Sequence, residues 1–187
     1  MSKTPLYYYL HYPYANLRTL VEYYNINPVA DREDLNEVYE NIYVGNISTA
    51  CNKEKLEELG IKNVITAVSG VPEIYPKDFN YKLVDVLDIT KENMIPVFDD
   101  TSQFIDESLK NGGKVYVHCM CGVSRSVTIV CAYLAKKHNI EPLVALDMIK
   151  KHRDIANPNL SFMQQLENYF ETVSGKKNDS VPDIITE

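Results

Sequence analysis

From Leu35 onward, short apolar runs alternate with longer segments in which apolar residues recur every three or four positions. The short runs predict buried strands, and the longer spacing predicts helices with one inward face. The predicted strands are 42–44, 61–67, 81–87 and 115–117, and the predicted helices are 52–59, 95–110, 125–138, 142–153 and 159–173. This alternation predicts one α/β domain, a sheet flanked by helices.

A loop between one predicted strand and the next predicted helix contains a cysteine and ends at an arginine. Cys119 follows the predicted strand 115–117 and precedes the helix 125–138, which Ser124 opens. A strand-to-helix loop turns backbone N–H groups inward, and the helix adds positive potential, so the loop suits a phosphate group and stabilises a thiolate. Arg125 adds a planar fork that can hold two phosphoryl oxygens.

The run His-Cys-x-x-Gly-x-x-Arg-Ser at 118–126 resembles the signature loop of the cysteine-based protein tyrosine phosphatases. Its Gly-x-Ser-Arg-Ser ending resembles the dual-specificity branch. Shorter matches occur at Ile42-Tyr-Val-Gly-Asn, Ala132-Tyr-Leu and Asn157-Pro-Asn with Phe162, so the resemblance covers about residues 36–172. It implies a central mixed, mostly parallel sheet between helices, and hydrolysis through a cysteinyl-phosphate.

The resemblance implies a role for each residue of this loop. Cys119 is expected to be the nucleophile, although cysteine is more generally a buried small hydrophobe. His118 is expected to support the loop, and Ser126 to stabilise the departing thiolate, with a helix cap as its alternative role. The phosphate is expected to bind Met120, Cys121, Gly122, Val123, Ser124 and Arg125, and glycine at 122 allows the loop to curve tightly.

The leaving group of a phosphate ester needs a proton from a donor outside the cradle. Asp88 stands at the end of the predicted strand 81–87, 31 residues before Cys119. The dual-specificity enzymes that the sequence resembles carry their acid at a similar separation from the cysteine. Asp85 is the second candidate. Asp99 and Asp100 fall on the helix 95–110 and are expected to be solvated surface residues.

The expected class of substrate follows from the resemblance. The chain has no tryptophan, so the tryptophan-containing acid loop of classical tyrosine phosphatases is absent. A shallower dual-specificity pocket is therefore expected, with phosphotyrosine and phosphoserine or phosphothreonine in proteins as substrates. The alternatives are a non-protein phosphate, such as an inositol lipid or an RNA 5′ end, and a non-catalytic phosphoprotein-binding module. No cofactor and no metal are expected.

Composition narrows the choice of partners. A net charge of −7 disfavours nucleic-acid binding, and no apolar run is long enough for a membrane span. We expect the cluster Lys150-Lys151-His152-Arg153 to lie on a solvated face, where it could still steer an acidic partner. The four cysteines match neither a disulfide framework nor a zinc site, so a reducing compartment, the cytoplasm or the nucleus, is expected. Cys121 is expected to face the core.

The sequence divides into three parts. Residues 1–34 hold half of the 14 tyrosines and are expected to pack as a helix on the core or to mediate a homodimer. Residues 35–173 form the expected catalytic domain. The polar tail 174–187 is expected to be disordered.

Overall fold

The computed structural model describes residues 34–175. Its strands are β1 (Leu35–Tyr39), β2 (Ile42–Gly45), β3 (Asn63–Ala67), β4 (Asn80–Val84) and β5 (Val115–His118). Its helices are α3 (Ile47–Ala50), α4 (Lys53–Glu58), α5 (Ile95–Leu109), α6 (Arg125–His138), α7 (Pro142–Lys150) and α8 (Leu160–Ser174), with a 3₁₀ turn, η1, at Lys110–Gly112. All of the predicted segment 1–34 except Asp34, and all but the first two residues of the predicted tail, lie outside the described residues.

The five strands form one mixed sheet in the order β1-β2-β5-β3-β4. β1 and β2 form an antiparallel hairpin, while the pairs β2–β5, β5–β3 and β3–β4 are parallel. Residues of β2 and β5 are buried along their whole length, as expected for strands covered on both faces. The α/β class and the mostly parallel sheet are confirmed.

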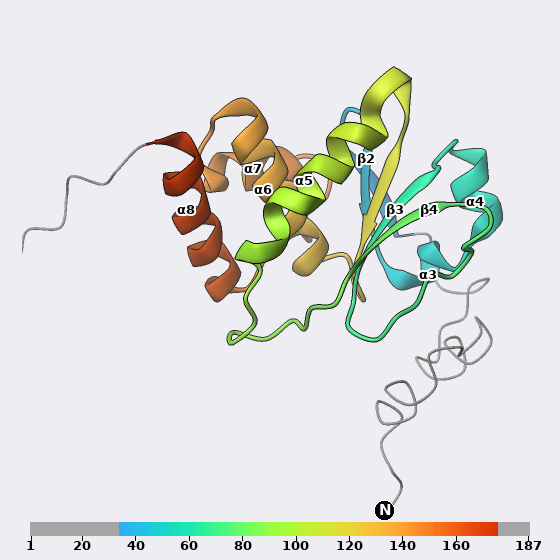
Figure 1. Ribbon diagram of the computed structural model, residues 1–187, viewed down its shortest axis with the longest axis horizontal. Coiled ribbons are helices and arrows are strands. Elements are labelled where there is room, and N and C mark those ends of the chain that lie inside the picture. Colours follow the sequence, from blue (N-terminus) through green and yellow to red (C-terminus); the bar gives the residue numbers. More distant parts are fainter. Residues whose placement is uncertain (1–33, 176–187) are drawn as a thin grey trace, which may run out of the picture.

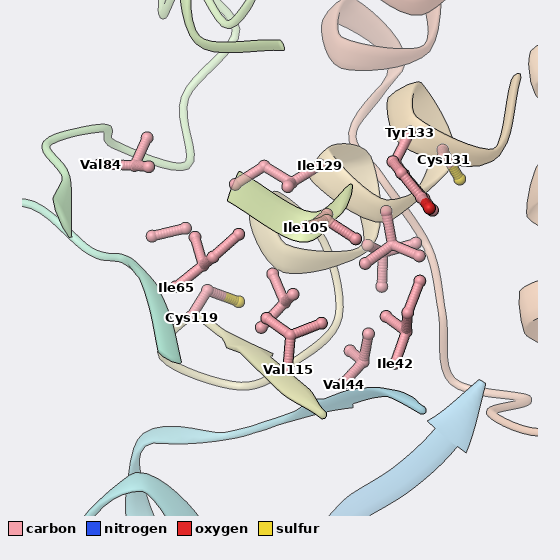
Figure 2. Close-up of a cluster of buried hydrophobic side chains, with 14 of the residues drawn as sticks. Ile42, Val44, Ile65, Val84, Ile105, Val115, Cys119, Ile129, Cys131 and Tyr133 are labelled. Atoms are coloured by element: carbon pink, nitrogen blue, oxygen red, sulfur yellow. The ribbon is translucent and has the colours of Figure 1, made fainter. Parts of the chain in front are cut away.

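Helices cover the sheet in two groups (Figure 1). α5, α6, α7 and α8 lie together on one side, and α3 and α4 lie on the other. α6 is the central helix of the larger group, because it is buried from Arg125 to Ala135 and packs against α5, α7, α8 and the sheet. Apolar side chains from the sheet, α5 and α6 form the core between these layers (Figure 2).

Several element boundaries differ from the prediction. β4 ends at Val84, so residues 85–94 form a loop rather than the end of a strand. α7 ends at Lys150, three residues before the predicted end. β1 was not predicted, because its polar residues Asn36 and Glu37 hide the strand pattern at the edge of the sheet. No helix between residues 34 and 175 is both long and apolar enough to cross a membrane.

Candidate active site

The sheet delivers Cys119 to the start of α6. β5 is buried along its length, and Cys119 follows its last residue. Figure 2 shows the Cys119 side chain among the apolar residues of the core, and the residue is 1% exposed. The chain then turns through residues 120–124 into α6. Parallel strands end on the same edge of the sheet, so the loop after β4 reaches the same region.

The backbone of the Cys119 loop is held from outside at five consecutive carbonyl groups. The amides of Ile47 and Asn157 donate to the carbonyls of Met120 and Val123, at 3.2 Å and 2.8 Å. The carbonyl of Ser124 accepts from Thr128 within α6. The N–H and C=O groups of a peptide point in opposite directions, so carbonyls held from outside leave the N–H groups on the inner side. The loop is thereby shaped to surround an anion.

Arg153 holds the two remaining carbonyls. Its Nε donates to the carbonyl of Gly122 at 2.7 Å, and its Nη2 donates to that of Cys121 at 3.3 Å. The same guanidinium forms a bidentate pair with Asp34, at 2.6 Å and 2.7 Å, and also donates to Asn36. The expectation that Arg153 lies on a solvated face is wrong, because its side chain is 1% exposed.

A sequence signal for the position of Arg153 existed. Ala145 and Ile149 are buried on α7, and Arg153 continues their four-residue spacing just past the end of the helix. Residues at this spacing share one face of a helix. The neighbouring Lys150, Lys151 and His152 are exposed, as expected for the rest of the cluster.

Glycine is required at position 122. Its φ is +67°, a conformation that L-residues with a side chain rarely adopt. A Cβ atom there would also stand 2.6 Å from the carbonyl oxygen of Gly45 and 2.6 Å from Arg153 Nη2. Residue 122 therefore fits between the loop and β2 only without a side chain.

The surroundings of the Cys119 sulfur favour a thiolate. Gly122 N and Ser126 Oγ donate to Sγ at 3.2 Å and 3.4 Å. Burial acts to raise the pKa of the Cys119 thiol, but hydrogen bonds from the hydroxyl and amide of Ser126, the charge of Arg125 and the Gly122 amide outweigh it and lower the pKa. The loop, Ser126 and Arg125 thus act together on this sulfur.

His118 is buried behind the nucleophile. Its Nδ1 lies 3.3 Å from the carbonyl oxygen of Cys119, and its Nε2 lies 2.9 Å from Thr66 Oγ1. Burial lowers the pKa of His118 to about 4, so the ring is neutral at physiological pH. A carbonyl can only accept, so Nδ1 carries the proton, and Nε2 accepts from Thr66. Tyr116 stacks on the imidazole at a centroid distance of 5.5 Å. The position suits a structural support and not an acid or base.

Arg125 and Asp88 meet at the entrance of the loop. Arg125 Nη1 donates to the carbonyl of Val86 at 3.2 Å, and Arg125 Nε lies 3.7 Å from Asp88 Oδ2. Nε is buried and has no hydrogen-bond partner among the described residues. A buried guanidinium nitrogen without a partner is costly, and an oxygen of a bound anion would satisfy it. The Asp88 side chain is 35% exposed, so it can be reached from outside.

The contacts of Ser124 differ from those predicted. Ser124 is the N-cap residue of α6, but its side chain makes no capping hydrogen bond. Its hydroxyl instead donates to Asp88 Oδ1 at 2.8 Å. Sequence reasoning also gave no role to Asn159, whose Nδ2 donates to the same oxygen at 3.0 Å. Both residues connect Asp88 to parts of the chain that are distant in sequence.

The other acidic candidates lie elsewhere. Asp85 is exposed in the loop after β4, and no hydrogen bond or ion pair joins it to the described residues of the Cys119 loop. Asp99 and Asp100 are exposed on α5, where they pair with Lys136 and Lys82, so their predicted surface position is confirmed.

The four cysteines differ in environment. Cys121 is exposed, which contradicts the expectation that it faces the core. Burial raises the pKa of the Cys51 thiol to about 11, and burial also raises that of Cys131. Cys119 alone has a lowered thiol pKa. Within residues 34–175 no group of three or more His, Cys, Asp or Glu side chains could hold a metal ion.

Comparison with known proteins agrees with this geometry. Residues 42–172 match the family model described as "Dual specificity phosphatase, catalytic domain". Dual specificity protein phosphatase 1B of Arabidopsis thaliana is 37% identical over 143 residues, which cover 76% of this chain and 86% of that protein.

Solved structures give the same result. The crystal structure of DUSP15 matches with a TM-score of 0.72 and 32% identity, and covers 78% of this chain and 92% of that one. A human tyrosine phosphatase-like serine/threonine/tyrosine-interacting protein matches with a TM-score of 0.69 and 31% identity, over 74% of this chain and 96% of that one. The family model alone spans more than two thirds of the sequence, and the chain belongs to the dual specificity phosphatase family.

Proposed function

We propose that this chain is a dual-specificity protein phosphatase that dephosphorylates phosphotyrosine and phosphoserine or phosphothreonine through a cysteinyl-phosphate. The observation that carries the proposal is the set of five loop carbonyls held outward around the buried Cys119 sulfur. The inward N–H groups of that loop and the unpartnered Arg125 Nε suit a phosphoryl group with charge on its equatorial oxygens.

In the proposed first step, the Cys119 thiolate attacks phosphorus in line with the leaving oxygen. The S–P bond forms as the P–O bond to the leaving group breaks, while the loop amides and Arg125 hold the equatorial oxygens. Asp88 gives its proton to the departing oxygen, so the alcohol or phenol leaves neutral.

In the second step, the Asp88 carboxylate takes a proton from water as the water oxygen attacks phosphorus. The S–P bond breaks, inorganic phosphate forms, and the sulfur leaves as a thiolate. The hydrogen bond from Ser126 Oγ to Sγ, at 3.4 Å, supports a role for Ser126 in stabilising that leaving group. His118 keeps the loop in shape through the Cys119 carbonyl.

Proteins are the proposed substrates. The similar Arabidopsis protein and others like it are named protein phosphatases. The loop side chains at 120–124 carry no charge that would bind the additional phosphates of an inositol lipid or an RNA end. The reducing cytoplasm or nucleus is the proposed location, because the mechanism needs a free thiolate.

The test is the phosphatase rate of the purified full chain on matched phosphotyrosine and phosphothreonine peptides, in the presence of a metal chelator. We expect activity on both peptides, complete loss in Cys119→Ser, and loss of turnover but not of substrate binding in Asp88→Ala. A folded wild-type chain without activity on either peptide would refute a protein phosphatase and lead to tests with lipid and RNA phosphates. An unchanged rate for Asp88→Ala at its pH optimum would move the acid elsewhere.

A binding module is the second candidate, since one similar human structure is named a phosphatase-like interacting protein. Turnover of a simple aryl phosphate by the purified chain would exclude a role in binding alone.

We also propose that residues 1–34 either pack as a helix on the catalytic domain or mediate a homodimer. Sedimentation of the full chain beside a shortened chain that begins at Asp31 distinguishes these two roles. A dimer that becomes a monomer on shortening supports the homodimer, and two monomers would refute the homodimer.

A further inference from the structure

The carboxylate of Asp88 is held by one residue of the Cys119 loop, Ser124, and by one at the start of α8, Asn159. Asn159 Nδ2 and Ser124 Oγ donate to Asp88 Oδ1, at 3.0 Å and 2.8 Å. The backbone N–H of Asn159 in turn donates to Ser124 Oγ at 3.3 Å. These three hydrogen bonds form a closed triangle between the loop after β4, the Cys119 loop and the start of α8.

The side chain of Asn159 is fixed at both of its polar atoms. Asn159 is the N-cap of α8, and its Oδ1 accepts from the backbone N–H of Phe162 at 3.0 Å. An amide group is planar, so a cap that fixes Oδ1 also fixes the direction of Nδ2. α8 itself is anchored in the core by Phe162, Leu166, Tyr169 and Phe170. The helix therefore aims one N–H donor at Asp88.

α8 holds the same loop at a second point. Gln165 Oε1 accepts from the amide of Met94 at 2.7 Å, and its Nε2 donates to the carbonyl of Glu92 at 2.8 Å. Residues 85–94 lie in no helix or strand, so these contacts supply an anchor that secondary structure does not. Gln165 fixes the far end of the loop, and Asn159 fixes the carboxylate.

The arrangement makes the two oxygens of Asp88 different. Oδ1 has two donors, whereas Oδ2 accepts no hydrogen bond from the described residues and lies 3.7 Å from Arg125 Nε. A proton on the carboxyl group is therefore best placed on Oδ2, the oxygen beside the guanidinium that faces the phosphate. This is the orientation that a proton donor to the leaving oxygen requires.

We propose that Asn159 is a positioning residue for the general acid, and that α8 is the platform that orients Asp88 with its proton on Oδ2. The inference rests on the proposed function. It makes a specific statement about chemistry: Asn159 acts only where the leaving oxygen must accept a proton. Loss of its donor must therefore slow the cleavage of esters with poor leaving groups and spare those with good ones.

The decisive variant is Asn159→Ser. Serine keeps an oxygen that can cap α8, but it has no N–H donor and is too short to reach Asp88. The assay compares kcat/KM for phenyl phosphate, whose leaving group resembles the tyrosine phenol of pKa about 10, with that for an aryl phosphate activated by electron-withdrawing groups. kcat/KM reports P–O cleavage even where hydrolysis of the cysteinyl-phosphate limits kcat.

We expect Asn159→Ser to lower kcat/KM for phenyl phosphate by roughly tenfold or more, within the range that general acids contribute, and to change that for the activated ester by less than about twofold. Asp88→Ala should show the same selectivity more strongly. Asn159→Asp keeps the cap but places a charge beside Asp88, and should be as selective as the serine variant.

The matched control is Asn52→Ser. Asn52 caps α4 through the amide of Lys55 at 3.0 Å, far in sequence from the site, so its loss should change neither ester. Equal losses on both esters in Asn159→Ser would mean a structural role only, and equal rates with wild type would also overturn the inference. A wild-type chain inactive on both esters would instead refute the proposed function.

Discussion

Arg153→Met is the substitution whose cost can be worked out most directly from the structure. Methionine is close to arginine in length and fills much of the same space, but it donates no hydrogen bond. The buried carbonyl of Gly122 and the partly buried carbonyl of Cys121 would each lose a charged donor. Hydrogen bonds to charged groups contribute about 1.5–3 kcal/mol each. Asp34 is 28% exposed, so water can solvate its carboxylate in the variant, and the loss of this ion pair destabilises the fold less than the loss of the carbonyl contacts.

These contributions predict a loss of about 4 kcal/mol in the free energy of unfolding, within the roughly 3–5 kcal/mol typical of broken buried ion pairs. A domain of this size has about 5–15 kcal/mol in total, so the variant should fold but with a Tm lower by about 8–16 °C. The KM for a small aryl phosphate should rise as well, because two of the five carbonyls that shape the loop lose their donors from Arg153.

Urea unfolding measures the loss, with Lys151→Met as the control at an exposed position two residues earlier. The control should stay within about 0.5 kcal/mol of wild type. The double variant Asp34→Ala/Arg153→Met should lose less than the sum of the single losses, because the two residues share one interaction. A loss below about 1 kcal/mol with an unchanged KM would refute the assigned role of Arg153.

Three further predictions use other parts of the site. Burial lowers the pKa of His118 from 6.5 to about 4, so between these pH values the unfolded chain binds a proton that the folded chain does not. As pH falls from 6.5 to 4, the free energy of unfolding of wild type should therefore drop by about 3 kcal/mol relative to that of His118→Asn. An equal pH dependence of urea unfolding in the two proteins would contradict this. Gly122→Ala should abolish turnover because its Cβ would meet the Gly45 carbonyl at 2.6 Å, and a turnover within tenfold of wild type would show that the loop can shift. Iodoacetamide at pH 6.5 should label Cys119 before the exposed Cys121, because partial desolvation and the neighbouring Cys119 charge raise the pKa of the Cys121 thiol. Inorganic phosphate should slow the labelling of Cys119, and first labelling at Cys121, read by mass spectrometry, would be the opposite result.

The sequence predicts the features that depend on neighbours in the chain. The strand, loop and helix around Cys119 follow from apolar spacing within one short segment, and the structure brings Cys119, Arg125, Ser126 and Asp88 to one place. The contacts missed from the sequence are long-range. Arg153 meets Asp34 across 119 positions and Asn159 meets Asp88 across 71, and no local pattern encodes such a pair. The prediction that Arg153 lies on a solvated face was wrong. A buried arginine is rare unless it is paired, and the partner of Arg153 is remote in sequence.

The outward-held carbonyls of the Cys119 loop also have a consequence for synthesis of the chain. Their donors come from before the loop, at Ile47, from α6, at Thr128, and from well after it, at Arg153 and Asn157. A nascent chain that has emerged only as far as α6 leaves the carbonyls of Cys121, Gly122 and Val123 without their donors. Domains generally fold as units, so these contacts wait for the rest of the domain. The thiolate and its surroundings are therefore completed only after α7 and the following segment have emerged and docked. Partly synthesised chains therefore contain Cys119 before its loop has the shape that binds a phosphate group.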